Sequence, residues 1–137
     1  MSFDADIPKH VPPVREIPHY HGDAVRALFV IEAILLVIAP SMGAILSVST
    51  TGALIGAVIL VIAAGITNPA QAWIQYVDEA LALLGAVVFG MRAVNTYPVA
   101  GTSLDTSFIF ALALALISLV ALYLTTRTIR GFIMRDY

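Results

Sequence analysis

The sequence has no cysteine and little charge. Without cysteine, the chain cannot form disulfides, thiolate nucleophiles, iron–sulfur clusters or cysteine-type zinc sites. Charged residues make up 12% of the chain and hydrophobic residues 60%, whereas soluble domains carry about 25% charged residues. A chain of 137 residues with so few charges cannot cover a soluble surface. The composition therefore excludes a soluble globular domain and a disordered chain, and it predicts a polytopic membrane protein.

Basic residues are also scarce, since Lys9 is the only lysine. No stretch is basic enough to follow a phosphate backbone, so nucleic acid is not an expected partner. No hydrolase or phosphate-binding motif is present, and we predict no catalytic residue, no cofactor and no enzymatic activity. Residues 1–23 contain acidic residues, four prolines and three histidines before any apolar run begins, which is not the pattern of a secretory signal.

Apolar segments separated by turn residues predict an all-α, integral membrane four-helix bundle over residues 24–134. The expected spans are about 24–48, 51–67, 69–94 and 104–131, between an extended, proline-rich N-terminal arm (1–23) and a C-terminal tail (135–137). Asp23 is the expected N-cap of the first helix, and Asn68-Pro69 the expected start of the third. Pro40 should kink the first helix because it lacks a backbone N–H.

Positive charge gathers at both ends of the chain, which predicts cytoplasmic termini (N-in, C-in) and an even number of spans. The residues concerned are Lys9, Arg15, Arg26, Arg127, Arg130 and Arg135. We expect an integral protein of a bacterial or archaeal cytoplasmic membrane, in contact with membrane lipid and with copies of itself or other membrane subunits.

Apart from Asp105 at the outer start of the fourth span, the spans contain three acidic residues, Glu32, Asp78 and Glu79, and all three are expected near the cytoplasmic end. Ionisable residues inside a membrane are costly and by default indicate function. One interpretation is a proton or cation site formed by these carboxylates. The other is structural, in which Arg26, Arg127 and Arg130 pair with them. Glu32 is the deepest of the three and is the strongest functional candidate.

Arg92 is expected about 7–8 Å below the outer membrane boundary, a depth from which an arginine can reach the interface. Asp105, at the start of the fourth predicted span, is expected on the outer side of the membrane, where it could pair with Arg92.

Small residues recur at four-residue spacing, which predicts close helix–helix packing in a membrane. The candidates are Ala39, Gly43, Gly52, Gly56, Ala82, Ala86 and Gly90.

The arm contains His19, His21 and Asp23 at alternating positions, a spacing that places three ligands on one side of an extended segment. This is a weak metal candidate, because one short segment rarely completes a coordination shell. The alternatives are incidental histidines in a solvated arm, or an extended segment that docks in a groove of a partner.

In outline, the small size, the four predicted spans and Glu32 in the first of them resemble the small multidrug resistance transporters. The long arm and the Asp78-Glu79 pair depart from that layout, and no motif is shared.

Two main functions remain open. The first is a non-catalytic packing or accessory role, by self-association or within a larger complex. The alternative is a small proton- or cation-coupled transporter, with Glu32 as the coupling residue and Glu79 or Asp78 as its partner. A lipid- or pigment-binding accessory bundle is a third.

Overall fold

The structure, a computed structural model, describes residues 19–97 and 105–135. Most of the predicted arm (1–18), the loop over 98–104 and residues 136–137 lie outside the described residues. Over the described ranges the chain forms four α-helices: α1 (Gly22–Ser41), α2 (Thr50–Ile66), α3 (Ala72–Asn95) and α4 (Thr106–Arg135). The prediction of an all-α chain with four helices is therefore confirmed.

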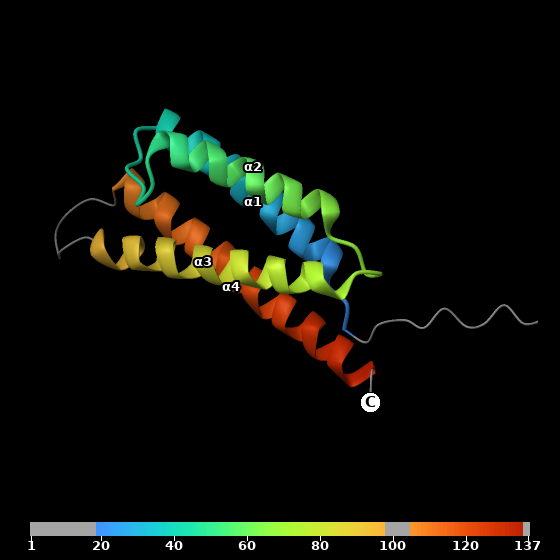
Figure 1. Cartoon of the computed structure of the whole chain (residues 1–137). Helices are drawn as coiled ribbons and strands as arrows, with labels where there is room; N and C mark the ends of the chain where they lie inside the picture. Colours follow the sequence, from blue (N-terminus) through green and yellow to red (C-terminus); the bar gives the residue numbers. More distant parts are fainter. Residues whose placement is uncertain (1–18, 98–104, 136–137) are drawn as a thin grey trace, which may run out of the picture.

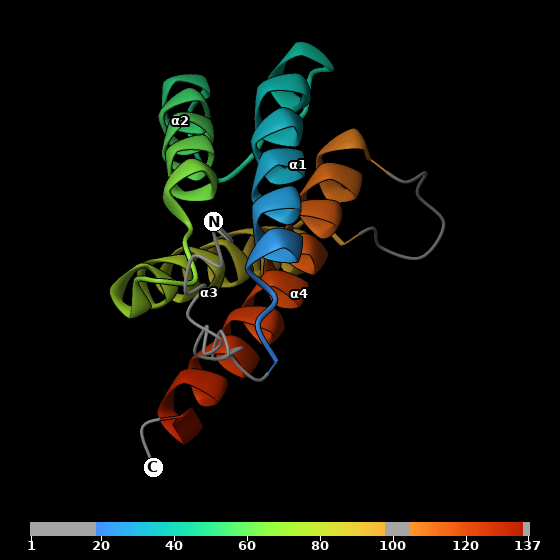
Figure 2. The same ribbon diagram turned by 90° about the vertical axis from the view of Figure 1, so that its right-hand side faces the viewer.

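The helices form two antiparallel pairs, α1 with α2 and α3 with α4 (Figures 1 and 2). The two pairs meet mainly where α1 packs on α4, whereas α2 and α3 touch at few points. The start of α1, the α2–α3 turn and the end of α4 lie together at one end of the bundle (Figure 1). We call this the charged end, because it carries four arginines: Arg26, Arg127, Arg130 and Arg135. The opposite end, with the α1–α2 connection, is the loop end.

Two helices, α1 and α4, are long and apolar enough to cross a membrane, and α2 is a shorter apolar helix. Only 33% of the most apolar stretch of α1 and 39% of that of α4 are buried inside the structure. The core helix of a soluble protein would be mostly buried, whereas here large apolar side chains such as Ile34, Val58 and Leu84 face outward. The fold is thus compatible with a membrane protein.

The first helix ends at Ser41, whereas the sequence predicted a kinked helix continuing to residue 48. Gly43 adopts a left-handed backbone with φ of 77°. Its N–H donates to the Pro40 carbonyl at 3.1 Å, and the Ala44 N–H donates to the Ala39 carbonyl at 3.0 Å. These two bonds form the Schellman motif that ends helices at a glycine. The helix therefore ends near Pro40 instead of being kinked there, because Gly43, three residues later, can adopt the left-handed backbone that terminates a helix.

The third helix also begins later than predicted, at Ala72 rather than at residue 69. The Asn68 side chain accepts a hydrogen bond from the Ala70 N–H at 2.8 Å, and its carbonyl accepts one from the Gln71 N–H at 3.2 Å. Asn68 therefore closes a turn of its own before the helix starts. Similarly, Asp23 lies in the first turn of α1 rather than at its N-cap, which is His21.

The α1–α2 connection is held at the loop end through the peptide groups of one residue, Ile45. Its N–H donates to Ser107 Oγ on α4 at 2.8 Å, and its carbonyl accepts from Arg92 Nε on α3 at 3.0 Å. The structure thus places the Arg92 guanidinium on a backbone carbonyl rather than on Asp105, which is exposed.

Alanines and leucines fill most of the space between the helices, and α2 buries four alanines and one leucine. Small side chains of this kind let helix backbones approach closely. Of the predicted packing residues, Ala39 and Ala82 are buried in the core, and a Cβ atom placed at Gly56 would lie 3.7 Å from Leu36 Cδ1. Gly43 is exposed and ends α1, so its role is conformational. Partly buried residues complete the predicted set: Gly52, Ala86 and Gly90.

Candidate functional site

Glu32 lies at the point where three helices meet. Its side chain projects from α1, and the residue is only 2% exposed. Ser118 on α4 donates a hydrogen bond to Glu32 Oε1 at 2.6 Å. On α3, a Cβ atom at Gly85 would overlap the Ser118 hydroxyl and lie 3.0 Å from Glu32 Oε1. The absence of a side chain at Gly85 therefore makes room for this carboxyl–hydroxyl pair.

A crevice of about 160 Å³ extends from Glu32 between α1, α2 and α3. Glu32 is the one ionisable residue in its lining, and the rest is almost entirely apolar: Leu36, Val48, Gly52, Ala53, Gly56, Ile59, Leu60, Leu81, Leu84, Gly85, Val88 and Phe89. The crevice exists because α2 and α3 touch at few points. It is smaller than the pockets of about 300–1,000 Å³ that hold drug-sized ligands. Its size suits water molecules or a small ligand.

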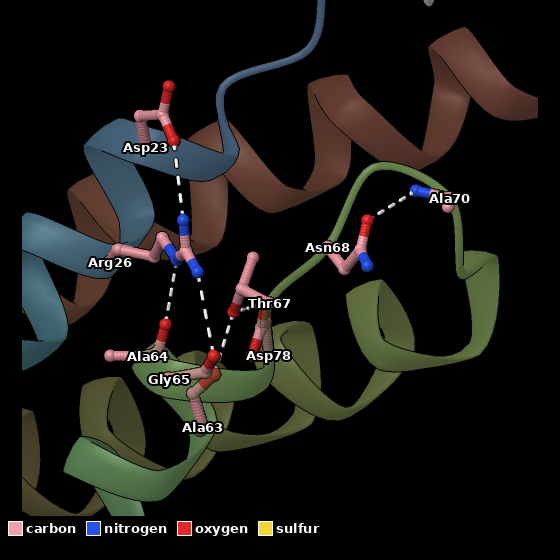
Figure 3. A network of polar contacts seen from close by, with 9 residues as sticks. All are labelled: Asp23, Arg26, Ala63, Ala64, Gly65, Thr67, Asn68, Ala70 and Asp78. Carbon is pink, nitrogen blue, oxygen red and sulfur yellow. Dashed lines mark hydrogen bonds and ion pairs between the residues drawn. The ribbon is translucent and has the colours of Figure 1, made fainter.

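Asp78 occupies a second buried position, at the charged end of α3, and is fully buried. The Thr67 hydroxyl lies 2.8 Å from Asp78 Oδ2 and also 2.8 Å from the Ala63 carbonyl (Figure 3). Thr67 follows the last residue of α2, so this contact ties the carboxyl of Asp78 to the end of the neighbouring helix.

Arg26 completes the polar contacts at the end of α2 (Figure 3). Its Nε donates to the Ala64 carbonyl at 2.8 Å and its Nη2 to the Gly65 carbonyl at 3.5 Å. Its Nη1 lies 3.7 Å from the Asp23 carboxylate. A guanidinium at this position satisfies carbonyls that the helix leaves free and interacts favourably with the negative end of the helix dipole. Arg26 thus joins α1 to α2.

Glu79, next to Asp78 in the sequence, has a different partner. The Thr126 hydroxyl of α4 lies 2.9 Å from Glu79 Oε1. The three predicted carboxylates are therefore each hydrogen-bonded to a different hydroxyl. Over residues 19–97 and 105–135, the one ion pair is Arg26 with Asp23. Arg127 contacts His19 and Tyr123, and Arg130 is exposed.

Several buried polar atoms at the charged end have no hydrogen-bond partner among the described residues. They are Tyr20 Oη, His21 Nε2, both amide atoms of Gln75 and Asp78 Oδ1. Burial, reinforced by the Asp23 carboxylate, raises the pKa of Tyr20. Buried polar groups are normally satisfied, so this end of the bundle has capacity for water or a polar ligand.

Sequence reasoning missed the hydroxyl partners Ser118, Thr67 and Thr126. It also missed Gln75. Ser118 is the one serine or threonine within residues 108–124, an otherwise apolar stretch, and that isolation was an available signal. Gln75 precedes Asp78 by three positions, which puts both on one face of α3.

The predicted metal candidates do not converge. No group of three metal-binding side chains (His, Cys, Asp or Glu) is close enough to hold an ion within the part of the chain that the structure describes. His19 faces Arg127, whose Nη2 lies 3.3 Å from His19 Nδ1. The backbone N–H of His21 donates to the Thr128 hydroxyl at 3.1 Å, and the Asp23 side chain is 91% exposed.

Comparison of the chain with protein-family models, with curated proteins and with solved structures found no match.

Proposed function

We propose that the chain is an integral membrane protein whose four helices all cross the bilayer, with both termini in the cytoplasm. The lengths of α1 and α4 and their outward-facing apolar side chains support insertion. The 20 residues of α1 correspond to roughly 30 Å, which is one hydrocarbon thickness. The start of α1 and the end of α4 lie at the same end of the bundle, as an even number of spans requires.

Within this bundle, Glu32 serves as the coupling residue of a small proton- or cation-coupled transporter. The observation that carries this proposal is a buried carboxyl in an apolar crevice with a hydroxyl, rather than an arginine, as its hydrogen-bond partner. A structural acid would be expected to pair with a cation, since an uncompensated buried charge is costly. Arg26 is the nearest predicted partner on the same helix, yet it binds the end of α2 and Asp23.

The arrangement suits reversible binding. When the Glu32 carboxyl is protonated it is neutral and compatible with the apolar crevice, and when it loses the proton it attracts a cation. Ser118 donates to the carboxylate and so keeps it oriented in both forms. The crevice lies between α1, α2 and α3 with Glu32 in its lining, so a small cation that enters the crevice would meet the carboxyl.

A hydrophobic carbodiimide tests the site without knowledge of the substrate. Dicyclohexylcarbodiimide reacts with protonated carboxyls that are accessible from an apolar phase. We expect peptide mass spectrometry of the full chain in vesicles to find Glu32 as the modified residue, with no label in Glu32→Gln. Glu79→Gln is the matched control, because Glu79 sits against an exposed hydroxyl, and it should be labelled at Glu32 like the wild type. Equal labelling at Glu79, or none at Glu32, contradicts the proposal.

Proton movement tests the transport step itself. Vesicles containing the chain are loaded with a pH-sensitive dye and given a potassium diffusion potential. We expect proton entry in the wild type and in Glu79→Gln, and loss of that entry in Glu32→Gln. A wild-type chain that moves no more protons than empty vesicles would overturn the proton-coupled form of the transport proposal.

The second candidate function is the packing or accessory role. It is supported by α2, which exposes Ile55, Val58 and Ile62 while contacting α3 at few points. A copy of the chain, or another membrane subunit, would cover this face by van der Waals packing. Cross-linking in native membranes tests it. A monomer at all cross-linker concentrations, with no partner attached, would exclude this role.

A further inference from the structure

The charged end contains a cleft that is separate from the Glu32 crevice. It has a volume of about 280 Å³ and is lined by His19, Arg127, Arg130, Gly131 and Met134. Two of the five lining residues are arginines, in a chain with a net charge of −2 and seven basic residues in all. The cleft is therefore a local concentration of positive charge.

The side chain of Arg127 is fixed in this cleft from two sides. Its Nη1 lies 3.4 Å from the Tyr123 hydroxyl, and its guanidinium carbon lies 5.7 Å from the centroid of the Tyr123 ring. Its Nη2 lies 3.3 Å from His19 Nδ1. His19 adopts a left-handed backbone, with φ of 60°, which is uncommon for a residue other than glycine. An arginine held in this way loses less conformational freedom when it binds a ligand.

Arg130 follows Arg127 by three positions, so the two side chains leave the same face of α4. Arg130 is exposed, which leaves its guanidinium available to a ligand entering the cleft. Two planar guanidinium groups on one face present paired N–H donors, and these match the oxygens of a phosphate better than a single ammonium would.

We propose that this cleft binds a phosphate group, carried either by the headgroup of an anionic phospholipid or by free inorganic phosphate. Arg127 and Arg130 donate to the phosphate oxygens, and His19 holds Arg127 in place. Phosphate binding in this cleft does not depend on Glu32, so it can be tested separately from the transport proposal.

The lipid source is tested with the full chain in vesicles of equal parts phosphatidylglycerol and phosphatidylcholine. Native mass spectrometry then measures the lipids that stay bound after extraction. We expect the wild type to retain phosphatidylglycerol preferentially, and Arg130→Gln and Arg127→Gln each to reduce this retention roughly fivefold. Arg135→Gln is the matched control, since Arg135 lies on the same helix outside the cleft and stacks near Phe132, and it should retain lipid like the wild type.

The free-phosphate source is tested with the delipidated chain in detergent. Millimolar inorganic phosphate, compared with chloride at equal ionic strength, should raise the unfolding temperature of the wild type and of Arg135→Gln but not of Arg130→Gln. Selective lipid retention with no effect of phosphate assigns the headgroup, and the reverse assigns free phosphate. The proposal is overturned if Arg130→Gln and Arg135→Gln behave alike in both arms.

Discussion

Ser118 donates a hydrogen bond of 2.6 Å to Glu32 although the two residues lie 86 positions apart in the sequence. The bond joins α1 to α4, the two helices that are both long and apolar enough to cross a membrane. It links the first and last helices of the bundle at the same point where the candidate site lies, so changes at this pair report on both folding and function.

Removing the hydroxyl should cost stability because it leaves a buried carboxyl without a partner. We expect Ser118→Ala to lower the free energy of unfolding by about 1–3 kcal/mol, measured by denaturant titration in mixed micelles. Ser41→Ala is the control, because Ser41 is exposed and contacts only a carbonyl of its own helix at 3.5 Å. It should stay within about 0.5 kcal/mol of the wild type.

The same pair predicts non-additivity. The double variant Glu32→Leu with Ser118→Ala removes both polar groups, so it should be more stable than Ser118→Ala alone. The free energy of unfolding is also measured for Glu32→Leu alone. If the change in the double variant equals the sum of the changes in the two single variants, the hydrogen bond contributes little to stability.

Gly85 predicts a steric effect at the site. Gly85→Ala places a methyl group against the Ser118 hydroxyl and Glu32 Oε1, and overpacking of this kind costs about 1–3 kcal/mol of unfolding free energy. Gly90→Ala on the same helix is the control, since no atom lies within 4 Å of its new Cβ. It should be neutral or slightly stabilising. Equal effects at the two glycines would place the carboxyl–hydroxyl pair elsewhere.

Gly43 predicts a purely conformational effect. Its φ of 77° disfavours any side chain, although no atom lies within 4 Å of a Cβ placed there. We expect Gly43→Ala to lower the free energy of unfolding by about 1–2 kcal/mol. Gly65→Ala, which is helical and equally open, should cause no loss. The two variants are compared by thermal unfolding followed by circular dichroism.

Tyr20 predicts a loss of stability at alkaline pH. Its pKa is raised in the folded chain by burial, first of all, and then by Asp23. A raised pKa means that the folded state holds this proton more tightly. The stabilisation is therefore fully present below the unfolded pKa of about 10, and it is lost as pH rises through the folded value. Unfolding free energies measured across this range should fall in the wild type, and the fall should be smaller in Tyr20→Phe.

The sequence carried enough information to predict four helices, because apolar runs and turn residues act locally. The predicted end of α1 was wrong. Whether the helix kinks at Pro40 or ends before Gly43 depends on the backbone hydrogen bonds of Gly43 and Ala44. The predicted start of α3 was too early for a related reason, since the Asn68 side chain closes a separate turn by accepting a hydrogen bond from the Ala70 N–H. In both cases the hydrogen bonds that a turn makes within a few residues decide where the helix ends or begins.

The candidate site was predictable in part. Glu32 stands out in an apolar run, so its burial could be anticipated. Its partner could not, because helix periodicity gives the direction of a side chain but not which of three other helices it meets. The acids were expected to face one another or an arginine, whereas each is bonded to a hydroxyl: Ser118, Thr67 and Thr126. Ser118 stands alone in an apolar stretch and so offered a signal, whereas Thr67 and Thr126 lie next to other polar residues and offered none.

Ile45 is anchored by its backbone rather than by its side chain, which is 68% exposed. Selection should therefore constrain the side chains of Arg92 and Ser107 more strongly than the side chain of Ile45. Position 45 should accept almost any residue except proline, which has no N–H to donate to Ser107. Substitutions at Arg92 and Ser107 should instead be rare in relatives, or should appear together with changes in the length of the α1–α2 connection. A set of homologous sequences would thus reveal this contact through positions 92 and 107, while position 45 itself would look unimportant.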